Sequence, residues 1–279
     1  MHNVLNWFQG LVKYTLVVVI SLFLVVIFAA SCAHIPEVNP LCAPGVFGER
    51  VSEQTLPYDI RSIPCEYAKC WTIPVDDKGG VVLVDTGMDP EAKELIQHLQ
   101  KRRIEVRAVL LTHGHLDHAG AAYLFAEQGI PVYLQDPDLP FLRLQRRHRA
   151  ILPRIGQFFL PSPIAPEESF SPRDRTWLHF EKNSIQVVHL PGHTPGSSAY
   201  LVGEVLFTGD ALVGPNPGGL CAAPPQVNES NDAAWRTLSR LADLPFSMVA
   251  DGHYGVTRDA KRALELSKKK WRQQLKSRQ

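Results

Sequence analysis

The stretch VRAVLLTHGHLDHAG, residues 106–120, places three histidines and one aspartate directly after an apolar run. VRAVLLT has the composition of a buried strand, and the sequence predicts that this strand ends at His113. Residues two apart on an extended backbone point to the same side, so His113 and His115 can meet one cation. Asp117 and His118 follow at the entry of a predicted helix and approach from another direction. Imidazole together with carboxylate suits zinc, iron or manganese.

Three later segments repeat this order of apolar run, glycine and metal-capable side chain. They place His193 in HLPGHTPGSS, Asp210 in LFTGDAL and His253 in VADGHYG. A single histidine after a strand is more often a turn or core residue, and a single aspartate there can simply cap a helix. Four agreeing segments instead predict one metal site, with enough ligands for two cations. For His189, inside a predicted strand, we expect a supporting or packing role.

The ordered set VLVDTG, THGHLDHAG, PGHTPGS, TGD and DGH resembles the motif set of the metallo-β-lactamase superfamily over about residues 70–255. The resemblance implies an α/β (α+β) fold, a four-layer αββα sandwich with metals at one edge between the sheets. It implies a first metal held by His113, His115 and His193. It implies a second metal held by Asp117, His118 and His253, with Asp210 bridging the two. Asp85 in VLVDTG matches a family aspartate that supports the metal loops.

By the same resemblance, we expect a metal-dependent hydrolase in which a hydroxide bridging two divalent ions attacks the substrate. Zinc is the first expectation, with iron or manganese as alternatives. Two cations about 3.5–4 Å apart can lower the pKa of a shared water to roughly 7. Asp117 is the candidate catalytic residue, because it can also orient the hydroxide and pass a proton, although ligation alone explains its position.

The expected substrate is a small ester, lactone or thioester. Asp210 fills the bridging position, where the true β-lactamases of the family generally lack an aspartate, so a lactamase is disfavoured. The core resembles thioesterases of the glyoxalase II type, but only 26 residues follow His253 and we do not expect their helical C-terminal domain. The alternatives are a mononuclear iron persulfide dioxygenase, or a phosphodiesterase or β-lactamase of the same superfamily. The net charge of +1 gives no general attraction to nucleic acid, and none is expected as a partner.

Residues 14–30 contain no charged side chain and predict a membrane-inserting or signal segment. The sequence around Cys32, AASC, resembles the cleavage box of bacterial lipoproteins, which makes Cys32 a candidate lipidation site. An uncleaved anchor and an ordinary cleaved signal are the other two interpretations. We expect membrane attachment through this segment, with the body on the extracytoplasmic side, periplasmic or at the cell surface.

The predicted organisation is an N-terminal segment at 1–32, a linker at 33–60 and a hydrolase domain at 61–279, with an insertion at 136–175. A solvated helix face or a membrane contact would explain the basic stretch 143–154 within the insertion.

Several elements of the hydrolase domain are also predicted. We expect a hairpin around DDKGG, a helix with Pro90 near its first turn, a later helix capped by Asn231 or Asp232, and a basic C-terminal helix. In an exported protein, Cys65 and Cys70 are close enough in sequence to pair.

Overall fold

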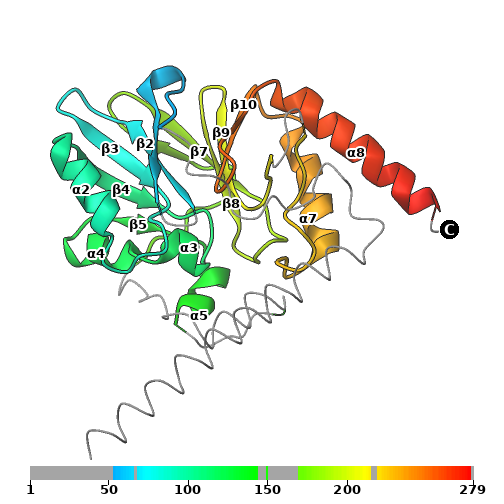
Figure 1. Cartoon of the computed structure of the whole chain (residues 1–279), viewed down its shortest axis with the longest axis horizontal. Coiled ribbons are helices and arrows are strands. Elements are labelled where there is room, and N and C mark those ends of the chain that lie inside the picture. The colour runs from blue at the N-terminus through cyan, green and yellow to red at the C-terminus, as the bar shows by residue number, and fades with distance from the viewer. Residues whose placement is uncertain (1–52, 66–67, 144–148, 150–168, 215–218, 278–279) are drawn as a thin grey trace, which may run out of the picture.

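The computed structural model describes residues 53–65, 68–143, 149, 169–214 and 219–277. In this part of the chain, two sheets stack face to face and helices cover their outer faces, which confirms the predicted four-layer sandwich (Figure 1). The first sheet has the order β1-β2-β3-β4-β5, with bounds Arg61–Pro64, Lys69–Pro74, Gly80–Val84, Glu105–Leu110 and Val132–Tyr133. The second sheet has the order β11-β10-β9-β8-β7-β6. Its strands are β6 (Trp177–His179), β7 (Ser184–His189), β8 (Ser198–Val202), β9 (Val205–Gly209), β10 (Met248–Asp251) and β11 (Val256–Thr257).

Helices lie on both sides of the sheet pair. Figure 1 shows α2 and α4 beside the first sheet, and α7 and α8 beside the second. The α-helices are α2 (Lys93–Lys101), α3 (Leu116–Ala119), α4 (Ala122–Glu127), α5 (Leu139–Leu142), α7 (Asn231–Thr237) and α8 (Ala260–Ser277). The short 3-10 helices are η1 (Pro57–Asp59), η2 (Asp136–Asp138) and η3 (Leu238–Leu241).

The layers are held by three apolar clusters. Between the sheets, Trp71 packs edge-on against Phe207 with ring centroids 5.8 Å apart. Leu95 and Phe125 bury the outer face of the first sheet under α2 and α4. Leu264 of α8 belongs to the cluster on the outer face of the second sheet. Each fully buried side chain of this size contributes roughly 1.5–3 kcal/mol, so the sandwich forms a rigid base for its edge loops.

Parallel pairing brings several predicted site segments to one edge. β3 pairs with β4 and β9 pairs with β10, both in parallel, so the carboxyl ends of each pair coincide. Asp85 follows β3, His113 follows β4, and Asp210 follows β9. His253 follows β10 at the same edge. The topology therefore collects side chains that are up to 168 positions apart in the sequence.

The folded body begins earlier than the predicted boundary at residue 60. Leu56 and Ile60 are buried and belong to the cluster between the sheets, so the last residues of the predicted linker are part of the core. The apolar side chains there outweigh the Pro-rich composition that suggested a linker.

Two helix starts also differ from their predictions. The cap of α7 is Ser230, whose hydroxyl accepts from the backbone N–H of Ala233, rather than Asn231 or Asp232. Helix α2 begins at Lys93, beyond Pro90, because the Asp89 carboxylate accepts the backbone N–H of Lys93 and closes a separate turn first.

Other expectations have mixed outcomes. The hairpin joining β2 and β3 and the C-terminal helix α8 are confirmed. Cys65 and Cys70 are free thiols. The segment 1–32 with Cys32, and most of the basic stretch 143–154, lie outside the described residues. Among the described residues, no helix is long and apolar enough to cross a membrane.

Candidate metal centre

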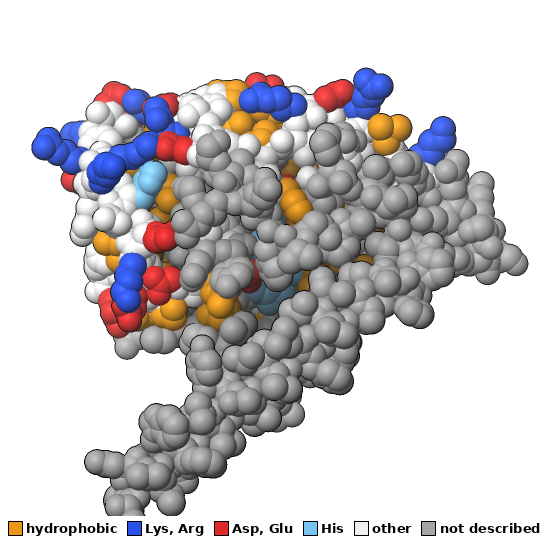
Figure 2. Space-filling view, in the orientation of Figure 1, with side chains coloured by type: hydrophobic (Ala, Val, Ile, Leu, Met, Phe, Trp, Pro, Cys, Tyr) orange, Lys and Arg blue, Asp and Glu red, His pale blue; other side chains and the backbone are white. Residues whose placement is uncertain are grey.

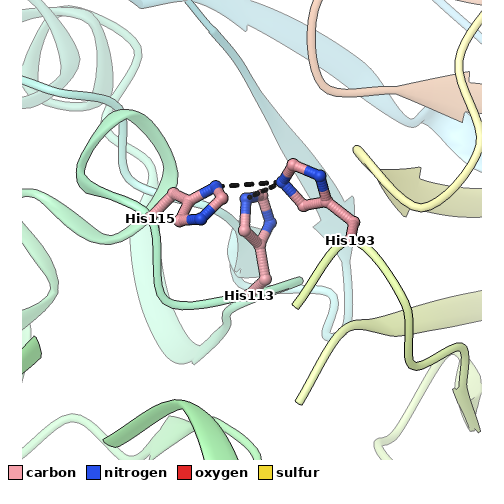
Figure 3. Close-up of side chains that lie close together, drawn as sticks. All are labelled: His113, His115 and His193. Carbon is pink, nitrogen blue, oxygen red and sulfur yellow. Dashed lines mark hydrogen bonds between the residues drawn. The ribbon is translucent and has the colours of Figure 1, made fainter. Parts of the chain in front are cut away.

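Three histidines from two loops converge on one point. The Nε2 atom of His193 lies 3.1 Å from Nε2 of His113 and 2.9 Å from Nδ1 of His115. Figure 3 shows the three rings with these nitrogens turned toward one another. All three side chains are buried. A ring nitrogen carries at most one proton, so His193 Nε2 cannot donate to both neighbours.

A second group lies beside the first and shares an aspartate with it. The carboxylate oxygens of Asp210 lie 3.6 Å from His193 Nε2, 3.4 Å from His118 Nε2 and 3.1 Å from His253 Nε2. Asp117 completes the second group, with Oδ2 3.6 Å from His253 Nε2. The structure therefore brings together all seven predicted ligand residues, with Asp210 between the two groups.

The donor geometry fits a metal cation. Zn–N bonds of 2.0–2.1 Å at tetrahedral angles separate two ligand nitrogens by about 3.3 Å, close to the spacing of the three histidines. His118 Nε2 and Asp210 Oδ1 are buried and make no hydrogen bond of ordinary geometry among the described residues. Buried polar atoms that face one another without hydrogen bonds are costly, and a cation bound between them removes that cost.

Asp85 contacts the first loop and the second group, the supporting position that the resemblance implies. Its Oδ2 lies 2.8 Å from Nδ1 of His118, and its Oδ1 accepts the backbone N–H of Thr112 at 2.8 Å. A carboxylate at Nδ1 holds a proton there, so Nε2 is the ring nitrogen that can bind a cation. Asp85 itself sits behind the ligands, with φ of 60°.

The protonation of the two groups differs in the metal-free chain. Burial, reinforced by His118 and His193, holds the pKa of His113 well below its usual range, so its imidazole is neutral. Burial alone would lower the pKa of His253, but Asp210 and Asp117 outweigh it and raise that pKa to about 9.

The shared carboxylate is affected by its neighbours in turn. Burial alone would raise the pKa of Asp210, whereas His253 and His118 lower it well below its usual range. A cation in the second group would replace the protons that now balance these carboxylates.

The centre is not sealed from solvent. The side chain of Asp117 is 27% exposed to solvent, and that of His253 is 14% exposed. Figure 2 shows histidine side chains on one face of the molecule, next to acidic and hydrophobic side chains. Asp117 is thus the most accessible carboxylate of the centre, which suits a group that handles substrate or water.

Sequence reasoning missed Asp138, which clamps the two loops of the first group together. Its Oδ2 accepts the backbone N–H of Gly114 at 2.8 Å and the Thr194 hydroxyl at 2.7 Å. Its Oδ1 accepts the backbone N–H of Gly196 at 2.7 Å. The missed signal was the pair of aspartates in QDPD after the apolar run PVYL, in which Asp138 is the second.

His189 lies outside the converging groups. Its Nε2 lies 3.0 Å from the carbonyl oxygen of Pro172, and its backbone N–H donates to Asp174. It therefore contacts the segment before β6, in line with the expected supporting or packing role.

Comparison with known proteins agrees with this geometry. The family model described as "Metallo-beta-lactamase superfamily" matches residues 69–253. The chain belongs to this superfamily. Superfamily membership and the histidine–aspartate cluster together support divalent-metal binding.

Among curated relatives, a hydroxyacylglutathione hydrolase of Rhodobacter capsulatus is 33% identical over 215 residues, covering 75% of this chain and 71% of the relative. Hydroxyacylglutathione hydrolase GloC of Haemophilus influenzae is 33% identical over 143 residues, covering 49% of this chain. The chain spans 63% of that relative's length and 57% of a Shewanella hydroxyacylglutathione hydrolase.

Solved structures share the fold. The BLEG-1 B3 metallo-beta-lactamase aligns with a TM-score of 0.58 and 25% identity, over 72% of this chain and 95% of that one. TTHA1623 in a di-iron-bound form aligns with a TM-score of 0.55 and 28% identity, over 76% of this chain and 97% of that one.

Proposed function

We propose that this protein is a metal-dependent hydrolase that uses two divalent ions on a small ester, lactone or thioester. The observation that carries the proposal is the convergence of two ligand groups on the shared carboxylate of Asp210. The relatives named hydroxyacylglutathione hydrolase support the thioester class, because a hydroxyacylglutathione is a thioester. Zinc is proposed first, and the di-iron form of TTHA1623 supports iron as the alternative metal.

The two ions would be held by the residues that the structure brings together. We assign the first to His113, His115 and His193, the second to Asp117, His118 and His253, and the bridge to Asp210. Bound there, the ions would supply a bridging hydroxide near neutral pH and a positive field for the developing oxyanion.

The chain's own side chains would then control the proton and the geometry. Asp117, the more exposed carboxylate, lies where it can orient the attacking water and pass its proton to the leaving group. Asp85 holds His118 in one tautomer, and Asp138 fixes the two loops of the first group. Burial of the remaining ligands limits bulk water around the reacting atoms.

A substrate panel with metal analysis tests the proposal. The protein is loaded separately with zinc, iron and manganese and assayed on thioesters, lactones, esters, phosphodiesters and β-lactams. We expect chelator-sensitive turnover of a thioester, lactone or ester, with two metal ions per chain. One iron per chain with oxygen consumption would instead identify a dioxygenase, and exclusive β-lactam turnover a lactamase.

A matched pair of histidine variants tests the site. We expect His115→Ala to abolish hydrolysis while its far-UV circular dichroism stays unchanged. His179→Ala removes an exposed histidine outside the centre and should keep full turnover. Undiminished hydrolysis in His115→Ala would exclude the mechanism.

We further propose that residues 1–32 attach the protein to a membrane with the hydrolase body outside the cytoplasm. The uncharged run at 14–30 and the box around Cys32 support this proposal. Mass analysis of the mature chain tests it. A lipidated N-terminal Cys32 indicates a lipoprotein and an intact Met1 in the membrane fraction indicates an uncleaved anchor, whereas a soluble mature chain contradicts attachment.

A further inference from the structure

A buried lysine from the first sheet reaches the back of a predicted ligand on the second sheet. Lys69, the first residue of β2, is only 7% exposed. Its ammonium group donates a hydrogen bond to the backbone carbonyl of His253. Its backbone N–H donates to the carbonyl of Gly252 at 2.8 Å. These two hydrogen bonds join the first sheet directly to the segment that follows β10 in the second sheet.

The segment that Lys69 holds is short and turns sharply after β10. The Asp251 carboxylate accepts the backbone N–H groups of His253 at 2.8 Å and Tyr254 at 2.6 Å. These bonds shape the turn from within β10, but they do not tie it to the other sheet. Lys69 supplies that tie, and the Trp71 indole N–H adds a longer contact of 3.4 Å to the carbonyl of Asp251.

A lysine at this position has a cost that needs an explanation. Burial lowers the pKa of Lys69, and the Asp251 carboxylate opposes that change. An apolar side chain of similar length would fill the same space without desolvating a charge. What only the ammonium provides is a strong donor fixed on the carbonyl of His253, whose ring nitrogen lies 3.1 Å from the bridging Asp210.

We propose that Lys69 is a positioning residue for the second metal, one that fixes the backbone of His253 so that its imidazole faces Asp117 and Asp210. This inference rests on the proposed two-metal site. It assigns to Lys69 no role in the first group, because none of the hydrogen bonds described for it reaches those histidines. Loss of the ammonium should therefore weaken binding of the second ion and leave binding of the first ion almost unchanged.

The test is a cobalt(II) titration of metal-free protein, followed by visible absorption and metal analysis. In Lys69→Met we expect the dissociation constant of the second ion to rise about 10- to 100-fold, the usual effect of losing a supporting contact behind a ligand. The first ion should bind with a constant within about threefold of wild type. Lys69→Arg keeps a donor and should recover most of the second site. The matched control is Lys182→Met, which removes an exposed lysine paired with Asp77.

The outcomes separate this inference from the proposed function. A wild-type protein that binds a single ion overturns the two-metal proposal and the role of Lys69 with it. Two ions in wild type with unchanged constants in Lys69→Met overturn the role of Lys69 alone. Parallel weakening of both sites, with reduced urea stability of the metal-free protein, also overturns it and leaves a general structural role. If Lys69→Met does not fold, the same cobalt titration is carried out on Lys69→Gln, whose side chain is too short to reach the carbonyl of His253. The same outcomes then support or overturn the role of Lys69.

Discussion

Asp138 offers a test of how the first metal group is held. The Asp138→Asn variant keeps the size of the side chain but replaces one acceptor oxygen with an NH2 donor. Both carboxylate oxygens accept a backbone N–H in the native protein, one from Gly114 and one from Gly196. Whichever way the amide turns, one buried N–H group loses its acceptor, which costs about 1–3 kcal/mol of the free energy of unfolding.

The size of this loss should depend on pH, and the sign follows from the native carboxyl. Burial raises the pKa of Asp138 from its usual 3.8 to about 6. Between these values the folded chain binds more protons than the unfolded chain, so wild-type stability falls as pH rises. The difference between these two values corresponds to about 3 kcal/mol. Asn does not titrate, so the stability advantage of wild type over the variant should be about 2–3 kcal/mol larger near pH 4 than near pH 8.

The measurement is urea unfolding of metal-free wild type and variant from pH 4 to 8, followed by circular dichroism. Contributions from all other titrating groups cancel in the difference between the two curves. The control is Asp136→Asn, which removes an exposed carboxylate from the same turn. A difference between wild type and Asp138→Asn that does not vary with pH would refute the reasoning.

Three further results are expected. Asp85→Asn should weaken binding of the second ion about 10- to 100-fold, because an amide can donate to Nδ1 of His118 and drive the proton onto the ligating nitrogen. Unchanged binding would contradict the tautomer argument. Burial alone would lower the pKa values of both histidines of the second group, but neighbouring carboxylates raise that of His253 to about 9 and that of His118 well above its usual range, so the second ion must displace a proton from each ring. Its affinity should increase by up to about 100-fold per pH unit between pH 6.5 and 8.5, and a titration with constant affinity would count against this. Gly209→Ala should cost more stability than Gly129→Ala in urea unfolding. Both glycines have positive φ, but a Cβ at position 209 would lie 2.2 Å from the hydroxyl oxygen of buried Thr112, whereas a Cβ at position 129 would meet open space. Equal losses of unfolding free energy would show that the clash is relieved.

The predicted strands and ligand residues came from patterns that lie within a few positions of one another. VRAVLLTHGH shows a buried strand and two histidines on one side of it, and TGD and DGH show the same order of strand, glycine and ligand. Such patterns are readable because the strand period and the turn requirement of glycine act locally. The seven residues that converge were all named from these patterns and the resemblance they carry.

Other features depended on packing between distant segments. The start of α2 at Lys93 and the cap of α7 at Ser230 were each set by one side-chain hydrogen bond that competes with the general preference. Leu56 and Ile60 became core residues because the two sheets close over them, although their local composition resembled a linker.

By itself, the sequence predicted two batches of strands with covering helices and the seven converging side chains, because apolar periodicity and glycine-led strand ends act over short distances; the αββα order was implied by the resemblance that these motifs carry. Only the tertiary structure decided what stands behind those side chains. Asp138 takes its role from Gly114 and Gly196, and Lys69 takes its role from a carbonyl 184 positions away. Both are common polar residues, and their importance comes from backbone groups that meet them only after the sheets have stacked.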